Sequence, residues 1–313
     1  MRIATIVPVS PFENLKTLKE SVEHVKSICN GKIVYVVDRN CKEDERGKII
    51  REMGVDVLER DERRGKRAGA INDAVKYLSN FKPDFVLILD VDSRTDRETI
   101  DNCISALLRD KKAYIASTKR YISNSSNLVS ETIEAEYRLI NFLLSKSAFK
   151  QFNGLIGVLR FDFLLFNGLN EWAIAEDADF ATRMHAKGYR AIIAKGKIYE
   201  QAPLSWKDLY SQRKRWYFGG LQLWRYRKEM RKAPRKVRLS WLCALTLTYF
   251  PILFLLFLPV SLFLILGYYK RLSKLKIVAG FIIYSFVLQV SAISAFLNFI
   301  RGKEVEWNAI RRA

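Results

Sequence analysis

The chain has 313 residues, 49% of them hydrophobic, which excludes intrinsic disorder and leaves room for one large domain or two small ones. Four cysteines without a CxxC pair and only two histidines argue against a zinc ribbon, a disulfide framework or a histidine-based catalytic triad. The formal charge of +20 suggests nucleic-acid binding only if it is spread over the chain, but the excess falls almost entirely after residue 206.

Strand-like and helix-like segments alternate over the first 206 residues. The expected strands are Ile3–Val7, Lys32–Val37, Asp56–Leu58, Phe85–Leu89 and Ala113–Thr118, and helices between them include Asn14–Ser27, Asp44–Met53 and Gly69–Leu78. This alternation predicts a mostly parallel, doubly wound α/β sheet. Ligands of such sheets bind at the carboxyl ends of the strands, so the residues after each strand are candidate site residues.

Carboxylates stand directly after two of these strands. Asp38 ends one, and Asp90-Val91-Asp92 follows another. Two carboxylates one residue apart are suited to hold a divalent cation with one group and a ribose or base with the other, and such hard oxygen ligands favour Mg²⁺ or Mn²⁺. The alternative interpretation is a solvated loop in which an aspartate caps the next helix.

Two further polar motifs lie between and beyond these strands. Gly65-Lys66-Arg67 combines a small residue with basic side chains at the start of a helix, which suits an anionic nucleotide, although the spacing is not that of a P-loop. Glu176, Asp177 and Asp179 offer a general base for a hydroxyl nucleophile. An ordinary basic loop and an acidic helix N-terminus are the alternatives.

Residues 207–239 combine twelve Lys and Arg residues with many aromatic residues. On a helix, Gln212, Arg215 and Trp216 share one face that offers an amide, a guanidinium and a ring able to stack on a sugar. The composition predicts an amphipathic helix in the membrane interface, contacting anionic lipids. A nucleic-acid surface is the rival interpretation, and the hydrophobic segment that follows favours the membrane over it.

Two hydrophobic runs, at about 240–269 and 277–300, are long enough to cross a bilayer. The chain is thus expected to consist of a cytosolic domain over 1–206, an interfacial segment over 207–239, and a membrane part with a short basic tail over 240–313. The N-terminal segment reads as a strand rather than a signal peptide. An integral protein of the cell membrane is predicted, with a pair of buried core helices as the alternative and the topology of the first run left open.

In their order along the chain, these motifs resemble those of the family-2 glycosyltransferases, and among them the membrane synthases of hyaluronan, chitin and cellulose. The order is a strand with Pro8, then Asp38, Gly65-Lys66-Arg67, Asp90-Val91-Asp92, Glu176-Asp177 and Gln212-Arg213-Lys214-Arg215-Trp216. The segment from Asn153 to Arg160 resembles the part of the family that lines the acceptor.

The resemblance implies a GT-A fold, a nucleotide-sugar donor that is most often a UDP sugar, and Mg²⁺ or Mn²⁺. It assigns donor binding to Pro8, Asp38, Lys66, Arg67, Asp90, Gln212, Arg215 and Trp216. It assigns the acceptor to Asn153, Gly154, Arg160, Glu176 and Trp216, the metal to Asp92, and the catalytic base to Asp177. A single displacement at the anomeric carbon would invert it and form a β-glycosidic bond.

Three functions stay open on the sequence. The first is a metal-dependent polysaccharide synthase that acts on a saccharide or lipid-linked acceptor at the cytosolic membrane face. The second adds one sugar to a polyprenyl phosphate or another lipid. The third is a non-catalytic membrane protein that binds nucleotide sugars. Two hydrophobic runs do not enclose a polysaccharide channel within one chain, which leaves homo-oligomer formation open.

Overall fold

The computed structural model describes residues 1–257, 259, 275–303 and 305. The chain divides into two compact units. The first unit comprises Met1–Lys119 and Lys150–Tyr199, and the second comprises Arg120–Phe149 and Glu200–Ala313. The three-part division predicted from the sequence, at residues 206 and 239, stays a prediction.

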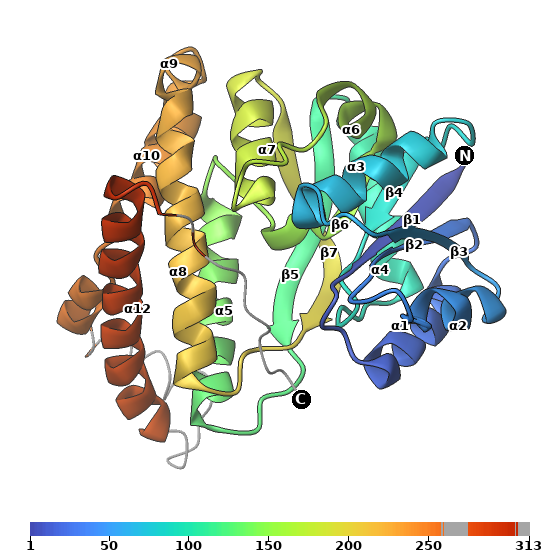
Figure 1. The fold of residues 1–313 in the computed structure, drawn as a ribbon. Helices are drawn as coiled ribbons and strands as arrows, with labels where there is room; N and C mark the ends of the chain where they lie inside the picture. The colour runs from blue at the N-terminus through green and yellow to red at the C-terminus, as the bar shows by residue number, and fades with distance from the viewer. Residues whose placement is uncertain (258, 260–274, 304, 306–313) are drawn as a thin grey trace. The chain divides into compact units, whose positions relative to one another are not determined.

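A sheet of seven strands, in the order β3-β2-β1-β4-β6-β5-β7, forms the frame of the first unit within the described residues (Figure 1). The strands are β1 (Ile3–Val9), β2 (Lys32–Asp38), β3 (Asp56–Arg60), β4 (Phe85–Ile88), β5 (Ala113–Ile122), β6 (Gly157–Arg160) and β7 (Arg190–Glu200). The pairs β1–β2, β1–β4 and β2–β3 are parallel. The carboxyl ends of β1 to β4 therefore meet at one edge of the sheet.

Strand β6 reverses the direction of the sheet between β4 and β5. It is antiparallel to both neighbours, so that Gly157 lies opposite Ile88 and Arg160 lies opposite Phe85. The start of β6, and not its end, is thus placed beside the carboxyl end of β4. This register decides which residues of the segment 153–160 reach the polar edge of the sheet.

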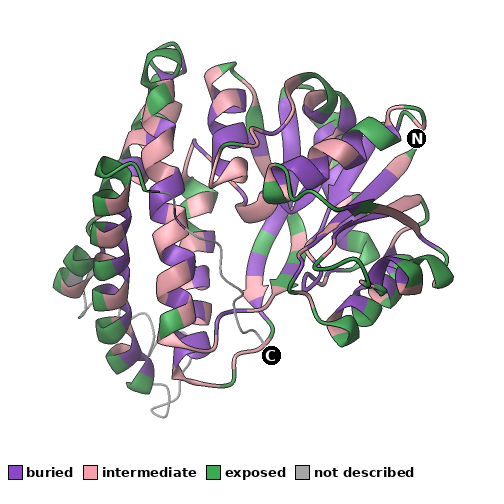
Figure 2. Ribbon diagram, viewed as in Figure 1, coloured by how far each residue is buried: buried purple, intermediate pink, exposed green. Residues whose placement is uncertain are grey.

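Helices cover both faces of this sheet (Figure 1). They are α1 (Leu15–Ile28), α2 (Arg46–Glu52), α3 (Lys66–Leu78), α4 (Arg97–Arg109), α6 (Phe161–Asn167) and α7 (Glu176–Ala186). Helices α1, α2 and α4 bury apolar residues against one face in a single hydrophobic core, and α3 packs on β1 and β2. Figure 2 shows the central strands β1, β2 and β4 as largely buried. The rigid sheet fixes the loops at its polar edge.

Local sequence explains where these helices begin. Asn14 caps α1, because its side chain accepts a hydrogen bond from the Thr17 N–H at 2.8 Å. Leu18, Val22 and Val25 then recur on one face and are buried. The prediction of strands alternating with helices is confirmed, and the structure adds β6 and β7, which the sequence pattern did not separate from their surroundings.

The second unit is helical. It contains α5 (Leu128–Lys146), α8 (Trp206–Gln222), η2 (Leu223–Tyr226), α9 (Arg227–Met230), α10 (Arg235–Leu247), η3 (Pro251–Phe257) and α12 (Lys276–Ile300). Helix α12 packs against both α5 and α8. The basic and aromatic segment expected over 207–239 is therefore built from several helices rather than one, and its place in a membrane interface stays a prediction.

The two hydrophobic runs differ in structure. The second forms α12, which among the described residues is the one helix long and apolar enough to cross a membrane. The first is interrupted: α10 ends at Leu247 and the 3-10 helix η3 begins at Pro251, because proline lacks the N–H that a continuing helix requires. The rest of the first run, at 258 and 260–274, lies outside the described residues.

Candidate active site

The guanidinium of Arg67 joins three segments that are distant in the sequence. Its Nε and Nη2 donate to Oδ1 of Asp90 at 3.0 and 2.8 Å. Its Nη1 donates to Oε1 of Glu176 at 2.9 Å, and Nη2 also donates to the carbonyl of Gly154 at 2.6 Å. The starts of α3 and α7, the end of β4 and the short helix η1 (Asn153–Leu155) therefore meet around one side chain.

Asp177 joins this cluster through the backbone of Gly154. The Gly154 N–H donates to Oδ2 of Asp177 at 2.6 Å. Gly154 has a φ of +63°, and a Cβ at this position would lie 3.0 Å from Nη2 of Arg67. Glycine is thus required both by the backbone conformation and by the close approach of the guanidinium. We call Arg67, Asp90, Gly154, Glu176 and Asp177 the Arg67 cluster.

The Arg67 cluster contains three carboxylates and one guanidinium, which pairs with Asp90 and Glu176. Burial raises the pKa of Glu176, and the nearby charge of Asp177 raises it further, while Arg67 acts in the opposite direction. Burial would lower the pKa of Arg67, but Asp90 and Glu176 outweigh it and raise the pKa overall, so Arg67 stays a cation. With three acids to one base, the cluster can accept a further positive charge.

Asp38 lies at the end of β2 and is only 6% exposed. Its Oδ1 is 3.4 Å from Nη1 of Arg60 and accepts no hydrogen bond from the described residues. Burial raises the pKa of Asp38, against the influence of Arg60 and Arg63. A buried carboxylate oxygen without a hydrogen-bond donor is a strong acceptor for an N–H or O–H group of a ligand.

Arg60 connects Asp38 to the turn that precedes α3. Its Nη1 donates to the carbonyl of Lys66 at 3.1 Å, and its Nη2 donates to the carbonyl of Arg64. Its Nε pairs with Oδ2 of Asp73 at 3.2 Å. Arg60 therefore shapes the turn that presents Arg67. Sequence reasoning missed Arg60. Its position opposite Asp38 becomes visible only when β2 is paired with β3 in register.

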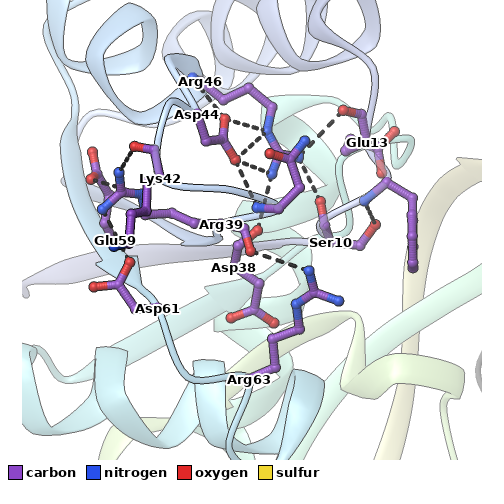
Figure 3. Close-up of polar contacts among 12 residues, drawn as sticks. Ser10, Glu13, Asp38, Arg39, Lys42, Asp44, Arg46, Glu59, Asp61 and Arg63 are labelled. Carbon is purple, nitrogen blue, oxygen red and sulfur yellow. Dashed lines mark hydrogen bonds and ion pairs between the residues drawn. The ribbon is translucent and has the colours of Figure 1, made fainter.

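A second arginine, Arg46, holds the loops behind Asp38 (Figure 3). It forms a buried ion pair with Asp44 at 2.6 Å, and donates to the carbonyls of Asp38 at 3.0 Å and Ser10 at 2.7 Å. The hydrogen bonds from Arg46 lower the pKa of Asp44 to about 2. We call Arg46 and these partners the Arg46 network. Sequence reasoning placed both charged residues in a helix and missed their pairing.

Asp92, the predicted metal ligand, is buried in the turn after β4. The Ser93 N–H donates to the carbonyl of Asp90 at 2.9 Å and closes this turn. Within the described residues, no three His, Cys, Asp or Glu side chains are arranged to hold a metal by themselves. A single carboxylate nevertheless fits a cation such as Mg²⁺, which usually binds one or two carboxylates together with substrate phosphates.

The remaining residues predicted in the first unit are placed unequally. Pro8 lies near the end of β1, opposite Val36, and Asn153 adjoins Gly154 in η1. Lys66 is exposed at the first position of α3, next to Arg67. Arg160 is not brought to the cluster: it donates to the carbonyls of Leu107 and Ala113, since the antiparallel register carries the end of β6 away from Asp90.

The motif on α8 belongs to the second unit. Gln212 is buried, and Arg213 forms a buried ion pair with Glu136 of α5 at 2.5 Å. The Arg213 guanidinium also lies 4.2 Å from the centre of the Trp216 ring. Arg213 thus has a structural partner that sequence reasoning missed. The roles of Gln212, Arg215 and Trp216 in donor and acceptor binding stay predictions.

Comparisons of sequence connect the chain to known enzymes. A family model described as glycosyl transferase family group 2 matches residues 85–297. Glucomannan 4-beta-mannosyltransferase 7 of Arabidopsis thaliana is 27% identical over 174 residues, which cover 53% of this chain and 31% of that protein. Probable glucomannan 4-beta-mannosyltransferase 4 of Oryza sativa subsp. japonica is 25% identical over 200 residues, covering 61% and 35%. The chain spans about a third of the length of these relatives.

Comparison of structures supports the fold. The mannosyltransferase PcManGT from Pyrobaculum calidifontis, in complex with GDP-Man and Mn²⁺, has a TM-score of 0.66 and 21% identity, over 97% of this chain and 88% of that one. S. aureus TarS has a TM-score of 0.50 and 15% identity, over 96% and 49%. The predicted α/β fold of the GT-A type is confirmed. Because the matching family model covers more than half of the chain, the protein belongs to glycosyl transferase family group 2, as the order of its motifs predicted.

Proposed function

We propose that the protein transfers a hexosyl group from a nucleoside diphosphate sugar to a hydroxyl group of a saccharide or lipid-linked acceptor, with inversion at the anomeric carbon. The Arg67 cluster carries the proposal, because Arg67 pairs with Asp90 and Glu176 at the carboxyl edge of the sheet, and the Gly154 backbone that Arg67 also binds holds Asp177. The names of the relatives are those of mannosyltransferases, so mannose is the sugar to test first.

Asp177 is the proposed general base. The Gly154 N–H holds its Oδ2, which fixes the carboxylate in the first turn of α7. In this orientation Asp177 would take the proton from the acceptor hydroxyl as that oxygen attacks the anomeric carbon from the face opposite the diphosphate. One displacement would convert an α-linked donor into a β-linked product, and no second nucleophilic carboxylate is needed.

Arg67 and Asp90 are proposed to prepare the donor side. Arg67 holds Asp90 with two hydrogen bonds, and Asp92 is proposed to provide a carboxylate for a divalent cation. When bound, Mg²⁺ or Mn²⁺ would supply positive charge to the departing diphosphate. The structure of the neighbour PcManGT contains Mn²⁺ and GDP-Man, which supports testing manganese first.

Asp38 is proposed to bind the base of the donor nucleotide. Its Oδ1 is buried and has no hydrogen-bond donor among the described residues, so an N–H group of a base would satisfy it. Uracil and guanine both offer such a group. UDP sugars, implied by the motif resemblance, and GDP-mannose, named with the solved neighbour, are therefore the two donor classes to compare.

The second unit is proposed to bring the enzyme to the cytosolic face of a membrane. Helix α12 is apolar along its length, and the basic residues of 207–239 precede it in the chain. These features support contact with anionic lipid headgroups. On α8, Gln212, Arg215 and Trp216 are proposed to contribute to the diphosphate and acceptor site, as in the family that the motifs resemble.

The test is incubation of the purified full chain with UDP and GDP sugars, saccharide acceptors and a lipid extract, in Mn²⁺, in Mg²⁺ and in EDTA. Released nucleoside diphosphate and product mass are measured. Transfer that EDTA abolishes and metal restores is expected, and full activity in EDTA would contradict the metal assignment. A product ladder indicates polymerisation, and a single addition to lipid indicates the simpler transferase. Binding of donors without turnover would support a non-catalytic protein.

A further inference from the structure

Trp172 is a large aromatic residue that the fold leaves in solvent. Its exposed fraction is 86%, although it stands only four residues before Glu176. Burying a side chain of this size generally stabilises a protein by about 2 kcal/mol or more, and the fold gains none of this at Trp172. Single exposed apolar residues are common, so the position of Trp172 gains meaning only from its surroundings.

One side of the loop that carries Trp172 is fastened to helix α3. The Asn72 side chain accepts from the Leu169 N–H at 2.8 Å and donates to the Leu169 carbonyl and to Oε1 of Glu171, both at 3.0 Å. Glu171 also pairs with Arg64. A Cβ on Gly65 would lie 2.6 Å from the Cβ of Glu171. Glu171, which precedes Trp172, is therefore held against the turn before Arg67.

The other side of the loop is fastened to helix α7. Asn170 accepts from the Trp172 N–H at 3.1 Å and donates to Oδ1 of Asp179 at 3.3 Å. Asp179 is fully buried, and its Oδ2 accepts from Nε of Arg183 at 2.9 Å. Arg183 also donates to the carbonyl of Gly168 at 2.7 Å. The backbone of Trp172 is thus bound to Asn170, and Asn170 is held by Asp179 of the helix that carries the proposed base.

The chain length between Trp172 and Glu176 limits their separation. Four residues span at most about 14 Å, even if fully extended. A short oligosaccharide is long enough to span separations up to this limit. A pyranose ring has faces of C–H groups that stack on an indole ring, while its hydroxyl groups stay hydrated at the edges.

We propose that Trp172 is an aromatic subsite for a sugar ring of the acceptor, one or more units away from the ring that receives the new sugar. The proposal rests on the proposed glycosyl transfer and specifies its acceptor: a saccharide of at least two rings rather than a free monosaccharide. A fixed backbone supports this role, because an ordered aromatic ring loses little conformational freedom when a sugar stacks on it.

The kinetic test compares Trp172→Ala and Trp172→Phe with Phe166→Ala. Phe166 is 81% exposed on α6, outside the loop, and is the matched control. Trp172→Ala is expected to raise the acceptor KM for mannose oligosaccharides by about tenfold, with a smaller rise in Trp172→Phe. The control is expected to keep the wild-type KM, and release of nucleoside diphosphate without acceptor is expected to be equal in all four proteins.

A binding test separates this proposal from the proposed function. Calorimetry measures the Kd of mannose oligosaccharides for the wild type and Trp172→Ala, without donor, and needs no turnover. Weaker binding by Trp172→Ala than by the wild type and Phe166→Ala supports the subsite. Equal binding by all three, or no saccharide binding by the wild type, overturns it. Absence of transfer from any donor, with saccharide binding intact, counts only against the proposed function.

Discussion

Two arginines at the polar edge of the sheet, the buried Arg46 and the half-buried Arg67, have different kinds of partners. Arg46 binds Asp44 and backbone carbonyls, including those of Ser10 and Asp38. Arg67 binds the carboxylates of Asp90 and Glu176, with one carbonyl, that of Gly154. Most partners of Arg46 are backbone carbonyls, which take no part in the proposed reaction. The partners of Arg67 include carboxylates to which we assign catalytic or binding roles.

This difference indicates that the Arg46 network stabilises the fold, whereas the Arg67 cluster belongs to the proposed active site. In the Arg46 network one cation is matched by one dedicated carboxylate, and carbonyls accept its other hydrogen bonds. The Arg67 cluster has three carboxylates and one cation, which pairs with two of them, so negative charge is left for a metal cation to neutralise. Substitutions in the two networks are therefore expected to affect different properties, stability in the first and turnover in the second.

The largest expected effect is on catalysis. Asp177→Asn removes the proposed base but keeps an oxygen that can accept from the Gly154 N–H. We expect kcat to fall by about 10²- to 10⁴-fold, since this is the usual contribution of a general base. Donor affinity, measured by calorimetry, is expected to stay near that of the wild type.

The control for Asp177→Asn is Asp162→Asn. Asp162 stands in the first turn of α6, as Asp177 does in α7, but is exposed and outside the Arg67 cluster. It is expected to turn over like the wild type. Turnover of Asp177→Asn within a few-fold of that control would remove Asp177 from the role of base.

A loss of stability is expected from Arg46→Met. Removing one member of a buried ion pair leaves the other charge uncompensated, which costs about 3–5 kcal/mol. Asp44 would be left in this state, and the carbonyls of Ser10 and Asp38 would lose a donor. Denaturant unfolding measures the change, with the exposed Lys48→Met on the same helix as control. Equal unfolding midpoints for the two variants would show that Arg46 does not stabilise the fold.

A smaller effect on activity is expected from Arg67→Lys. Lysine keeps the charge but offers no planar fork, so it cannot hold Asp90, Glu176 and the Gly154 carbonyl together. We expect kcat to fall by about 10- to 100-fold, equivalent to roughly 1.4–2.7 kcal/mol, with a smaller change in unfolding free energy than in Arg46→Met. Activity equal to that of the wild type would show that only the positive charge of Arg67 matters, and not its hydrogen-bonding geometry.

The sequence predicted the strand-end acids well and their arginine partners poorly. Asp38 and Asp90 follow apolar runs, and a parallel sheet necessarily brings such ends to one edge. The sequence around Arg46 and Arg60 gives no such signal, because a charged residue at the end of a short strand or in a helix is normally predicted to be exposed to solvent. Their burial follows from the pairing of β2 with β3 and from the packing of α2, which no local pattern records.

The segment 153–160 shows a second limit. Its sequence resembles an acceptor-lining segment, yet only its first half reaches the Arg67 cluster. The direction of β6 decides this: Gly157 lies opposite Ile88, while Arg160 lies opposite Phe85 at the far end of β4. Strand direction depends on long-range pairing, and the predicted mostly parallel sheet gave no reason to expect a reversal at β6.

The last expected effect concerns the pH dependence of stability and belongs to the Arg46 network. Hydrogen bonds from Arg46 lower the pKa of Asp44 from 3.8 to about 2, and the Asp44 side chain is 2% exposed. A carboxylate with a depressed pKa stabilises the fold above its unfolded pKa and loses this contribution as the pH falls through its folded pKa. The contribution is about 2 kcal/mol, lost between about pH 4 and pH 2.

Unfolding free energies of the wild type and Asp44→Asn, measured from pH 5 to pH 2, test this contribution. The difference between the two proteins is expected to be constant above pH 4 and to shrink by about 2 kcal/mol toward pH 2, because asparagine does not titrate. A difference that stays constant over the whole range would mean that Asp44 has an ordinary pKa. The Arg46–Asp44 ion pair would then contribute little to the stability that we assign to the Arg46 network.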